Sequence, residues 1–454
     1  ALGLFERPLV EVSRAAACFE TPAQRELARR AASESLVLLR NDGVLPLRPG
    51  LRRIAVLGPG ADDKRVLQGD YHYPAHQRVA DEVAGEALPA GAAPGGAAPG
   101  GAADLSLLPE TAGQWQPGPF YTRHVTPLEG IRACAGAETE VVSVAGCAVT
   151  GSDESGIAEA AALAAGADVA VVVVAGRSGL GTAATVGEAR DATDLGLTGA
   201  QLALLRAVAA TGTPVVGVVL SGRAHDLSEV DALCGALLQA WPLGEEGGTA
   251  LAEVLFGAVN PSGRLPVSLP RRVGQVPRYL GHRAGGSTAM FYGAYSDSPT
   301  APLYPFGHGL SYTSFEYGEL RVAARDTASP VEAEIEVANS GAVAGAEVVQ
   351  LYLSDLVASV VRPEAQLAAF ARVVLEPGER KLVRFEIHPS RLAFFDKALR
   401  RVAEPGAFRF AAGASSTDLR AVVEVEIGGS VVEHPITTLR PAVVSVEEVA
   451  TTGH

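Results

Sequence analysis

Asp168-Val-Ala-Val-Val-Val-Val174 is the stretch of this sequence that decides the fold. A short, continuous apolar run of this kind is typical of a β-strand that is buried on both faces. Three more short β-rich runs share the pattern, at residues 54–58, 214–220 and 236–240. Stretches with the length and the alanine or leucine content of covering helices lie at 153–165, 199–210 and 245–256. The alternation predicts an α/β fold, a layered α/β sandwich with a mainly parallel sheet.

The pattern changes beyond residue 329, where apolar and acidic residues alternate with a period of two. Val331, Ala333, Ile335 and Val337 fall on one face of the predicted strand, and Glu332, Glu334 and Glu336 fall on the other. Further short runs occupy 347–353, 382–387, 407–411 and 421–427. Turns such as Pro377-Gly378 and Pro405-Gly406 separate some of them. The second part is therefore predicted to be an antiparallel, all-β sandwich of about a hundred residues.

The length of the chain indicates how many domains to expect, and its charge and composition limit the classes of partner. A chain of 454 residues exceeds what one hydrophobic core usually serves, so two domains are expected. The 51 acidic residues outnumber the 37 basic ones, which gives a formal net charge of -14 at pH 7. A surface of this sign repels a phosphate backbone, so no nucleic acid partner is expected. No apolar segment approaches the length of a membrane span, so no membrane partner is expected either.

The first residues carry a helix signal but no visible targeting signal. Thr21-Pro22-Ala23-Gln24 combines an N-cap, a proline at the first helical position and a glutamine three residues after the cap, which is a capping-box pattern. Residues 1–8 contain neither an initiator Met nor a charged segment that leads into an apolar one, so they read as a cut end. The location of the protein stays open on this basis, with the cytoplasm slightly favoured over secretion.

A five-residue repeat of Gly, Ala and Pro interrupts the first domain at 91–103. The repeat is too poor in large apolar groups to offset the entropy that ordering it would cost. We therefore expect a flexible surface excursion over residues 80–120.

The motifs that suggest a cofactor or a metal are incomplete. Gly58-Pro59-Gly60 follows a predicted strand as a dinucleotide motif would, but Asp63 stands where the third glycine belongs. His72 and His76 have the spacing of a zinc-binding helix, yet Pro74 between them breaks that helix. The four cysteines, which include no C-x-x-C pair and which we interpret as buried thiols, are Cys18, Cys134, Cys147 and Cys234. The sequence therefore predicts neither a cofactor nor a metal, and it lacks the G-x-S-x-G elbow of α/β-hydrolases.

Several stretches resemble family 3 glycoside hydrolases, in the same order along the chain. The stretches at 32–47, 53–59, 241–248 (Trp241-Pro-Leu-Gly-Glu-Glu-Gly-Gly248), 255–266 and 304–313 resemble the family's α/β-sandwich domain. Val348-Val-Gln-Leu-Tyr352 and the turn at 404–406 resemble its fibronectin-type-III-like domain. The resemblance implies four units: a barrel end and interdomain linker at 1–30, the α/β-sandwich domain at 31–318, an immunoglobulin-like (fibronectin III-like) sandwich at 329–430 and a C-terminal tail at 431–454.

The same resemblance assigns a catalytic role to Glu188. In the β-glucosidase and β-xylosidase types, a Gly-rich loop ends in a Glu, two variable residues and an Asp, and a leucine-rich segment ending in Gln follows. Glu188, Asp191 and Gln201 stand at these places here, and by that match Glu188 is the general acid/base. Four residues depart from the family pattern. Thr198 replaces the usual Pro, Ala192 replaces the Arg that often follows the Asp, and Ala183 and Ala184 stand where larger or charged residues are expected. Without the resemblance, an acidic residue on a Gly-rich loop would be interpreted as merely solvated.

A retaining glycosidase needs two carboxyl groups about 5–5.5 Å apart, one to donate a proton and one to attack the anomeric carbon. The resemblance implies that the nucleophile is an Asp on an N-terminal (β/α) barrel, which we expect this chain to lack. We therefore expect a fragment that is inactive alone and that works with this barrel in cis or in trans.

The activity that the resemblance implies is β-glucosidase-like, the retaining hydrolysis of terminal non-reducing β-D-glycosyl residues, with a β-glycoside or oligosaccharide as substrate. Two alternatives stay open. One is β-xylosidase/α-L-arabinofuranosidase activity, and the other is a non-catalytic binding or scaffold protein that keeps these domains.

Overall fold

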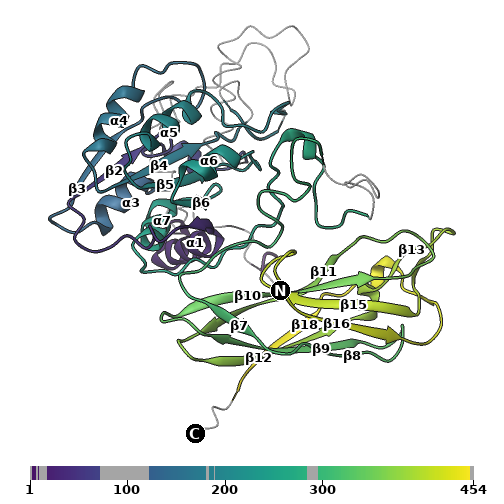
Figure 1. Ribbon diagram of the computed structural model, residues 1–454. Helices are drawn as coiled ribbons and strands as arrows, with labels where there is room; N and C mark the ends of the chain where they lie inside the picture. The colour runs from purple at the N-terminus through teal and green to yellow at the C-terminus, as the bar shows by residue number, and fades with distance from the viewer. Residues whose placement is uncertain are drawn as a thin grey trace.

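The computed structural model describes residues 3–6, 9, 18–71, 122–179, 184–188, 190–283 and 295–449. These residues form an α/β domain and a β-sandwich that lie against each other (Figure 1). The excursion expected over residues 80–120 and the pair His72 and His76 lie outside the described residues.

A six-stranded sheet forms the centre of the first domain. Its strands follow the order β1 (Val37–Asn41), β6 (Ala236–Gln239), β5 (Val215–Leu220), β4 (Val169–Ala175), β2 (Arg53–Leu57) and β3 (Glu140–Val144). Neighbouring strands are parallel except β1 and β6, which are antiparallel. The predicted layered fold with a mainly parallel sheet is therefore confirmed. The sequence patterns did not predict β1 and β3 as strands, because both are edge strands that end in or begin with polar residues.

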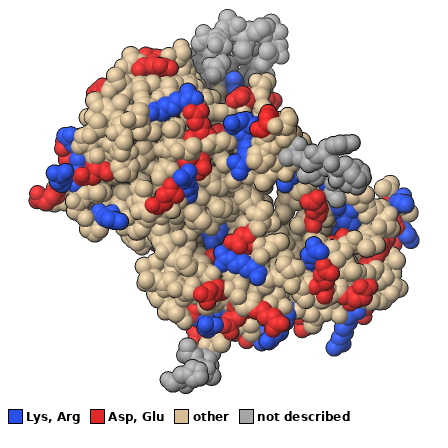
Figure 2. All heavy atoms as spheres, viewed as in Figure 1, with Lys and Arg blue, Asp and Glu red and all other residues tan. Residues whose placement is uncertain are grey.

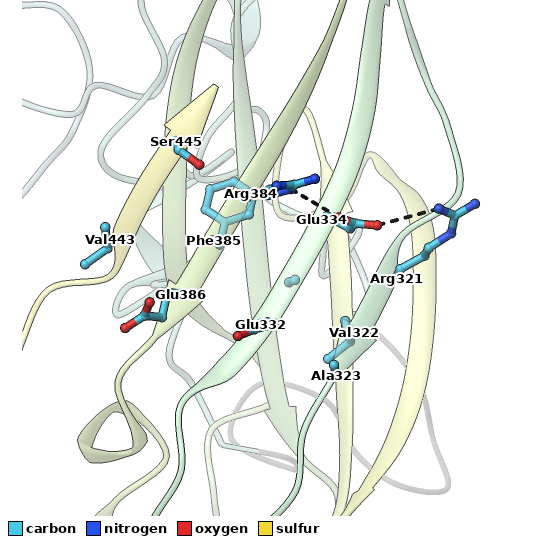
Figure 3. A pocket seen from close by; sticks show the side chains of 11 residues that line it. Arg321, Val322, Ala323, Glu332, Glu334, Arg384, Phe385, Glu386, Val443 and Ser445 are labelled. Atoms are coloured by element: carbon cyan, nitrogen blue, oxygen red, sulfur yellow. Dashed lines mark ion pairs between the residues drawn. The ribbon is translucent and has the colours of Figure 1, made fainter. Parts of the chain in front are cut away.

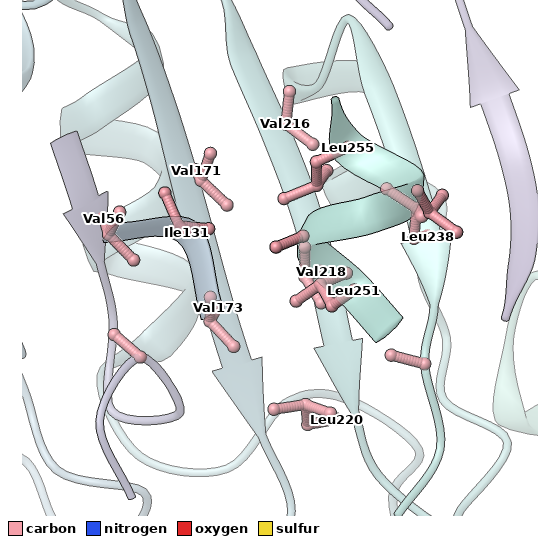
Figure 4. Close-up of a cluster of buried hydrophobic side chains, with 14 of the residues drawn as sticks. Val56, Ile131, Val171, Val173, Val216, Val218, Leu220, Leu238, Leu251 and Leu255 are labelled. Atoms are coloured by element: carbon pink, nitrogen blue, oxygen red, sulfur yellow. The ribbon is translucent and has the colours of Figure 1, made fainter. Parts of the chain in front are cut away.

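Helices cover both faces of this sheet. Helices α1 (Pro22–Ser35), α3 (Pro127–Cys134) and α7 (Gly247–Leu255) pack on one face, and α4 (Ile157–Ala165), α5 (Gln201–Ala209) and α6 (Ser228–Leu233) pack on the other. The first face is shown in Figure 4, where Val171 and Val218 of the sheet meet Ile131 of α3 and Leu251 of α7. Helix α1 begins with the predicted capping box on Thr21. No helix of the described residues has the length and the apolar character that crossing a membrane would need.

The alternating pattern of the second part produces a two-sheet sandwich. One sheet has the order β11 (Gln366–Leu375), β10 (Gly345–Asp355), β15 (Gly406–Gly413) and β16 (Leu419–Ile427). The other has the order β18 (Val443–Glu448), β12 (Arg380–Ile387), β9 (Val331–Asn339) and β7 (Phe315–Tyr317), with β8 (Arg321–Ala323) also on β9. The predicted alternation is confirmed in β9, where Val331, Ala333, Ile335 and Val337 are buried between the sheets. Phe385, Phe408 and Phe410 are among the largest side chains of this core.

Several short elements complete the chain. A small sheet of β13 (Phe394–Phe395), β14 (Arg401–Ala403) and β17 (Val432–Glu433) lies beside the sandwich. Short 3-10 helices span η3 (Lys64–Leu67), η5 (Val273–Gln275), η6 (Pro389–Arg391) and η7 (Ile436–Thr438). The segment assigned to a C-terminal tail thus contains β17 and the edge strand β18, which pairs with β12.

A buried ion pair joins the two domains. Arg264 Nη2 lies 3.0 Å from Glu347 Oε2 of β10, and both side chains are more than nine-tenths buried. The Tyr317 hydroxyl donates to Glu347 Oε1 at 2.9 Å. Burial raises the pKa of the Glu347 carboxyl above its usual range, against the opposing effect of the Arg264 charge. The orientation of the sandwich on the α/β domain therefore depends partly on a charge pair withdrawn from water.

The interpretation of all four cysteines as buried thiols is wrong. Cys18 and Cys134 are exposed, Cys147 is intermediate, and Cys234 is buried. Cys134 is the last residue of α3 and lies beyond Ile131, the last buried residue of that helix.

Candidate functional site

Two loops leave the same edge of the sheet, because β2 and β4 are parallel neighbours. The loop after β2 leads through η3 to Asp70 and Tyr71, and the loop after β4 leads to Glu188. In α/β folds ligands bind beyond the carboxyl ends of the strands, where such loops meet. Glu188 therefore occupies the edge at which a site in this fold is expected.

Gln201 fixes the root of the loop that carries Glu188. Its side chain is fully buried at the start of α5. Its Oε1 accepts from the Ala175 N–H at 2.7 Å, and its Nε2 donates to the Ala175 carbonyl at 2.9 Å. The Thr198 hydroxyl, at the place of the usual proline, donates to the Val149 carbonyl at 2.7 Å. The glutamine that ends the leucine-rich segment thus ties the end of β4 to the helix that follows the loop.

The loop closes on itself before it reaches Glu188. The Thr185 N–H donates to the Arg177 carbonyl at 2.8 Å, and the Gly179 N–H donates to the Val186 carbonyl at 3.1 Å. These bonds make a short parallel bridge between Ser178 and Val186. The residues on either side of the loop tip are therefore held together at its base.

Three arginines anchor the closed base to the rest of the domain. Arg177 Nη2 lies 3.0 Å from the Asp63 carboxylate. Arg223 Nη2 donates to the Thr185 carbonyl at 3.2 Å and to the Arg190 carbonyl at 2.5 Å. The buried Arg65 donates to the Ser178 carbonyl. Charged donors bound to backbone carbonyls hold this irregular segment in place of ladder hydrogen bonds.

The Glu188 side chain is exposed to solvent at the end of this loop. Its backbone N–H donates to Asp70 Oδ2 at 3.0 Å, and Asp70 Oδ1 accepts from the Ser178 hydroxyl. The Tyr71 hydroxyl donates to Glu188 Oε2. This hydrogen bond to a carboxylate raises the pKa of the Tyr71 phenol above its ordinary value.

The arrangement offers a proton donor and acceptor rather than a complete hydrolytic pair. The Glu188 carboxyl faces solvent, whereas both oxygens of Asp70 are engaged in holding the loop. The described residues contain no group of three or more His, Cys, Asp or Glu side chains that could hold a metal ion. A solvent-facing carboxyl group of this kind can donate or accept a proton.

The glycines of the incomplete dinucleotide motif have a packing role. A Cβ atom on Gly58 would lie 2.3 Å from the Val173 carbonyl oxygen, and one on Gly60 would lie 2.9 Å from Val173 Cγ1. Only glycine lets the loop after β2 pass this close to β4. Contact between two neighbouring strands accounts for both glycines without a bound pyrophosphate.

A buried Ser–His pair lies at the end of β5. Ser221 Oγ and His225 Nε2 are 2.9 Å apart, and His225 Nδ1 lies 3.1 Å from the Leu195 carbonyl oxygen. The two residues are only 1% and 5% exposed, and burial lowers the pKa of His225. A nucleophile needs access to its substrate, so this pair serves to attach the end of β5 to the segment after the Glu188 loop.

The β-sandwich carries a hollow of about 520 Å³ on the outer face of its second sheet (Figure 3). Glu334 of β9 is one of the residues that line it, and its carboxylate lies 3.3 Å from Arg384 and 3.6 Å from Arg321. The aromatic side chain that lines it, Phe385, is itself buried in the core. Figure 2 shows acidic and basic side chains interspersed over one face of the molecule rather than gathered by sign. The hollow therefore offers no aromatic sugar platform.

The sequence motif indicated Glu188 as a candidate acid/base, but it did not indicate the residues that contact Glu188. Asp70 and Tyr71 lie 118 and 117 positions before Glu188 in the sequence. The signal that could have located them is their position after a buried strand, since loops that follow neighbouring parallel strands meet at one edge.

Comparison with known proteins places this geometry in a family. Residues 36–312 match the glycosyl hydrolase family 3 C-terminal domain, and residues 347–416 match a fibronectin type III-like domain. A periplasmic β-glucosidase of Salmonella typhimurium is 36% identical over 432 residues, with 88% of this chain and 50% of that protein covered. A β-xylosidase of Formosa agariphila is 34% identical over 431 residues, with 93% of this chain and 53% of that protein covered.

The solved structures give the same result. The crystal structure of a Listeria innocua β-glucosidase in complex with glucose superimposes with a TM-score of 0.76 at 31% identity, covering 95% of this chain and 53% of that one. The chain thus spans about half the length of the curated relatives it matches. With its α/β sandwich, its fibronectin III-like sandwich and a family match across most of its length, the chain belongs to glycoside hydrolase family 3.

Proposed function

We propose that this chain supplies the acid/base half of a retaining β-glycosidase site, with Glu188 as the general acid/base. The observation that carries the proposal is the solvent-facing carboxyl of Glu188, held at the carboxyl edge of the sheet by a loop that is anchored at its base. The substrate class is a terminal non-reducing β-D-glucosyl residue of a β-glycoside or oligosaccharide.

The two steps of the reaction use Glu188 in opposite protonation states. In the first step the protonated side chain donates its proton to the leaving glycosidic oxygen while another carboxylate attacks the anomeric carbon. In the second step the Glu188 carboxylate accepts a proton from the water that hydrolyses the glycosyl intermediate. The Tyr71 hydroxyl, bound to Glu188 Oε2, can remain a donor to that oxygen in both states.

The attacking carboxylate is proposed to come from an N-terminal (β/α) barrel joined in cis or in trans. Two observations support this. Both oxygens of Asp70, the carboxylate in contact with the Glu188 backbone, are already bound within the loop. The chain also corresponds to about half of each relative, and the family matches fall on the C-terminal and fibronectin III-like domains.

Glucoside is the preferred substrate because the Salmonella typhimurium relative and the Listeria innocua structure are both β-glucosidases. β-Xylosidase activity is the second candidate, since the Formosa agariphila relative is a β-xylosidase at 34% identity over 431 residues.

The test compares this chain alone with the same chain joined to the barrel domain of a family 3 β-glucosidase. 4-Nitrophenyl β-D-glucoside and β-D-xyloside are assayed with both forms. Glu188→Gln should lower kcat of the joined enzyme by about 10²- to 10⁴-fold, the usual contribution of a general acid/base. The loss in kcat/KM, which reports the first step, should be smaller with 2,4-dinitrophenyl β-D-glucoside than with the 4-nitrophenyl compound, because its leaving group needs little protonation. Glu154→Gln, at another exposed glutamate, is the matched control.

The outcomes distinguish the need for a barrel, the acid/base role of Glu188 and a non-catalytic scaffold. Turnover by the chain alone would refute the requirement for a barrel. Unchanged kcat in Glu188→Gln would refute the acid/base role. A joined protein that folds but turns over neither substrate would favour the non-catalytic scaffold.

A further inference from the structure

We propose that Asp70 and Tyr71 are the positioning residues of Glu188, with Asp70 fixing its backbone and Tyr71 fixing its carboxyl group. This inference rests on the proposed acid/base role of Glu188 and adds the residues that make the role possible. Neither positioning residue is on the catalytic loop, because both belong to the segment that follows β2 and η3.

Asp70 ties the two ends of the catalytic loop with one side chain. Its Oδ2 accepts from the Glu188 N–H at 3.0 Å, and its Oδ1 accepts from the hydroxyl of Ser178, near the start of the loop. A carboxylate that accepts from two donors makes charge-assisted bonds, which are stronger than neutral ones. Loss of this side chain therefore frees both Ser178 and Glu188.

Gly187 provides an independent indication that the loop is built around Asp70. A Cβ atom at this position would lie 2.2 Å from Asp70 Oδ2, and Gly187 has a φ of +124°. Side chains rarely adopt this backbone conformation, and any side chain here would displace the Asp70 carboxylate. The lack of a side chain at Gly187 thus leaves the space that the Asp70 carboxylate occupies.

Tyr71 selects which oxygen of Glu188 carries the transferable proton. Its hydroxyl donates to Oε2, so in the protonated acid Oε2 acts as the carbonyl acceptor and the proton resides on Oε1. The phenol also limits the rotamers of an otherwise exposed side chain. Its own ring is 73% exposed, so it holds Glu188 from the solvent side rather than burying it.

The first test uses this chain alone and does not depend on activity. Asp70→Ala should speed hydrogen exchange of the Glu188 amide by about tenfold or more, because an amide without its acceptor exchanges from the native state. Asp70→Asn should restore part of the protection, since its amide oxygen can accept one of the two bonds. The matched control is Asp194→Ala, which removes a carboxylate bonded to the Gly196 N–H at 2.6 Å in a later turn of the same segment. It should leave Glu188 exchange unchanged.

The second test uses the chain joined to a family 3 barrel. Asp70→Ala and Tyr71→Phe should each lower kcat/KM for 4-nitrophenyl β-D-glucoside by about 10- to 100-fold, the range expected for a misplaced catalytic group. The kcat/KM for 2,4-dinitrophenyl β-D-glucoside should be nearly unaffected, because this ratio reports the first step and that leaving group does not need the acid. A general loss of structure would instead lower turnover of both substrates equally.

The results separate this inference from the function on which it rests. Equal exchange of the Glu188 amide in Asp70→Ala and the parent chain would overturn the positioning role even if Glu188→Gln is inactive. Faster exchange in Asp70→Ala together with an unaffected Glu188→Gln enzyme would support the structural contact and overturn the acid/base role. Equal losses in kcat/KM for both aryl glucosides would overturn the assignment of Asp70 and Tyr71 to acid catalysis.

Discussion

Replacing Arg264 by Ala should lower the free energy of unfolding, because it leaves the buried Glu347 carboxylate between the two domains without its charged partner. The guanidinium lies 3.0 Å from the Glu347 carboxylate, and the side chains are 8% and 3% exposed. After the substitution Glu347 keeps the Tyr317 hydroxyl as a donor but has no positive partner at that distance. Removing one member of a buried pair costs about 3–5 kcal/mol, mostly from leaving the other charge desolvated.

The penalty should grow with pH. Burial raises the pKa of Glu347 above its usual value of 4.5, and the Arg264 charge is the first influence that opposes this rise. A group whose folded pKa is raised contributes stability when protonated, and this contribution is lost as the pH rises through the folded pKa. Without Arg264 the folded pKa of Glu347 rises further. The loss of stability should therefore be smaller near pH 5 than at pH 7.5.

Urea unfolding followed by far-UV circular dichroism measures the effect. With a slope of about 2 kcal/mol/M, a loss of about 4 kcal/mol lowers the midpoint by about 2 M. The double variant Arg264→Met, Glu347→Leu should recover most of the loss, because an apolar pair leaves no unpaired charge. Arg384→Ala is the control, since its pair with Glu334 is 49% and 32% exposed and should contribute at most about 1 kcal/mol. A loss below about 1 kcal/mol at pH 7.5, or the same loss at pH 5, would refute the reasoning.

Three further predictions concern the α/β domain and its site. Leu251→Ala should lower the free energy of unfolding by about 2–5 kcal/mol in calorimetry, because Leu251 of α7 is fully buried against the sheet; a loss no larger than that of a surface substitution would contradict the packing. Glu188→Gln should lower the pKa of Tyr71 toward its ordinary value, because the carboxylate is the main cause of the rise; a titration of ¹³Cζ-labelled tyrosine that shows no movement would exclude the contact. Thr126→Ala should cost about 1–2 kcal/mol in urea unfolding, because its hydroxyl caps α3 and also donates to Asp62 Oδ1 at 2.8 Å; an unchanged midpoint would mean that the cap contributes nothing.

Local sequence patterns predict much of the secondary structure of this chain. The apolar run in β4 and the alternation in β9 each identify a strand and its buried faces, because side-chain direction alternates regularly along a strand. The same logic fails for edge strands. β3 is largely half-buried, and β18 is exposed along its whole length, so neither needs a strong apolar pattern. Cys134 was misjudged because its exposure depends on its place at the end of α3, beyond the last buried residue of the helix, Ile131.

The sequence by itself determined the layered α/β class, the β-sandwich that follows and the motif that marks Glu188, because each is encoded within a few neighbouring residues. Tertiary structure alone decided that Asp70 and Tyr71 meet Glu188, since this contact exists only because β2 and β4 are adjacent in the sheet. It also decided that Arg264 and Glu347 form a buried pair. Which strands become neighbours and which surfaces lose water are properties of the packed chain, and no short stretch of residues contains them.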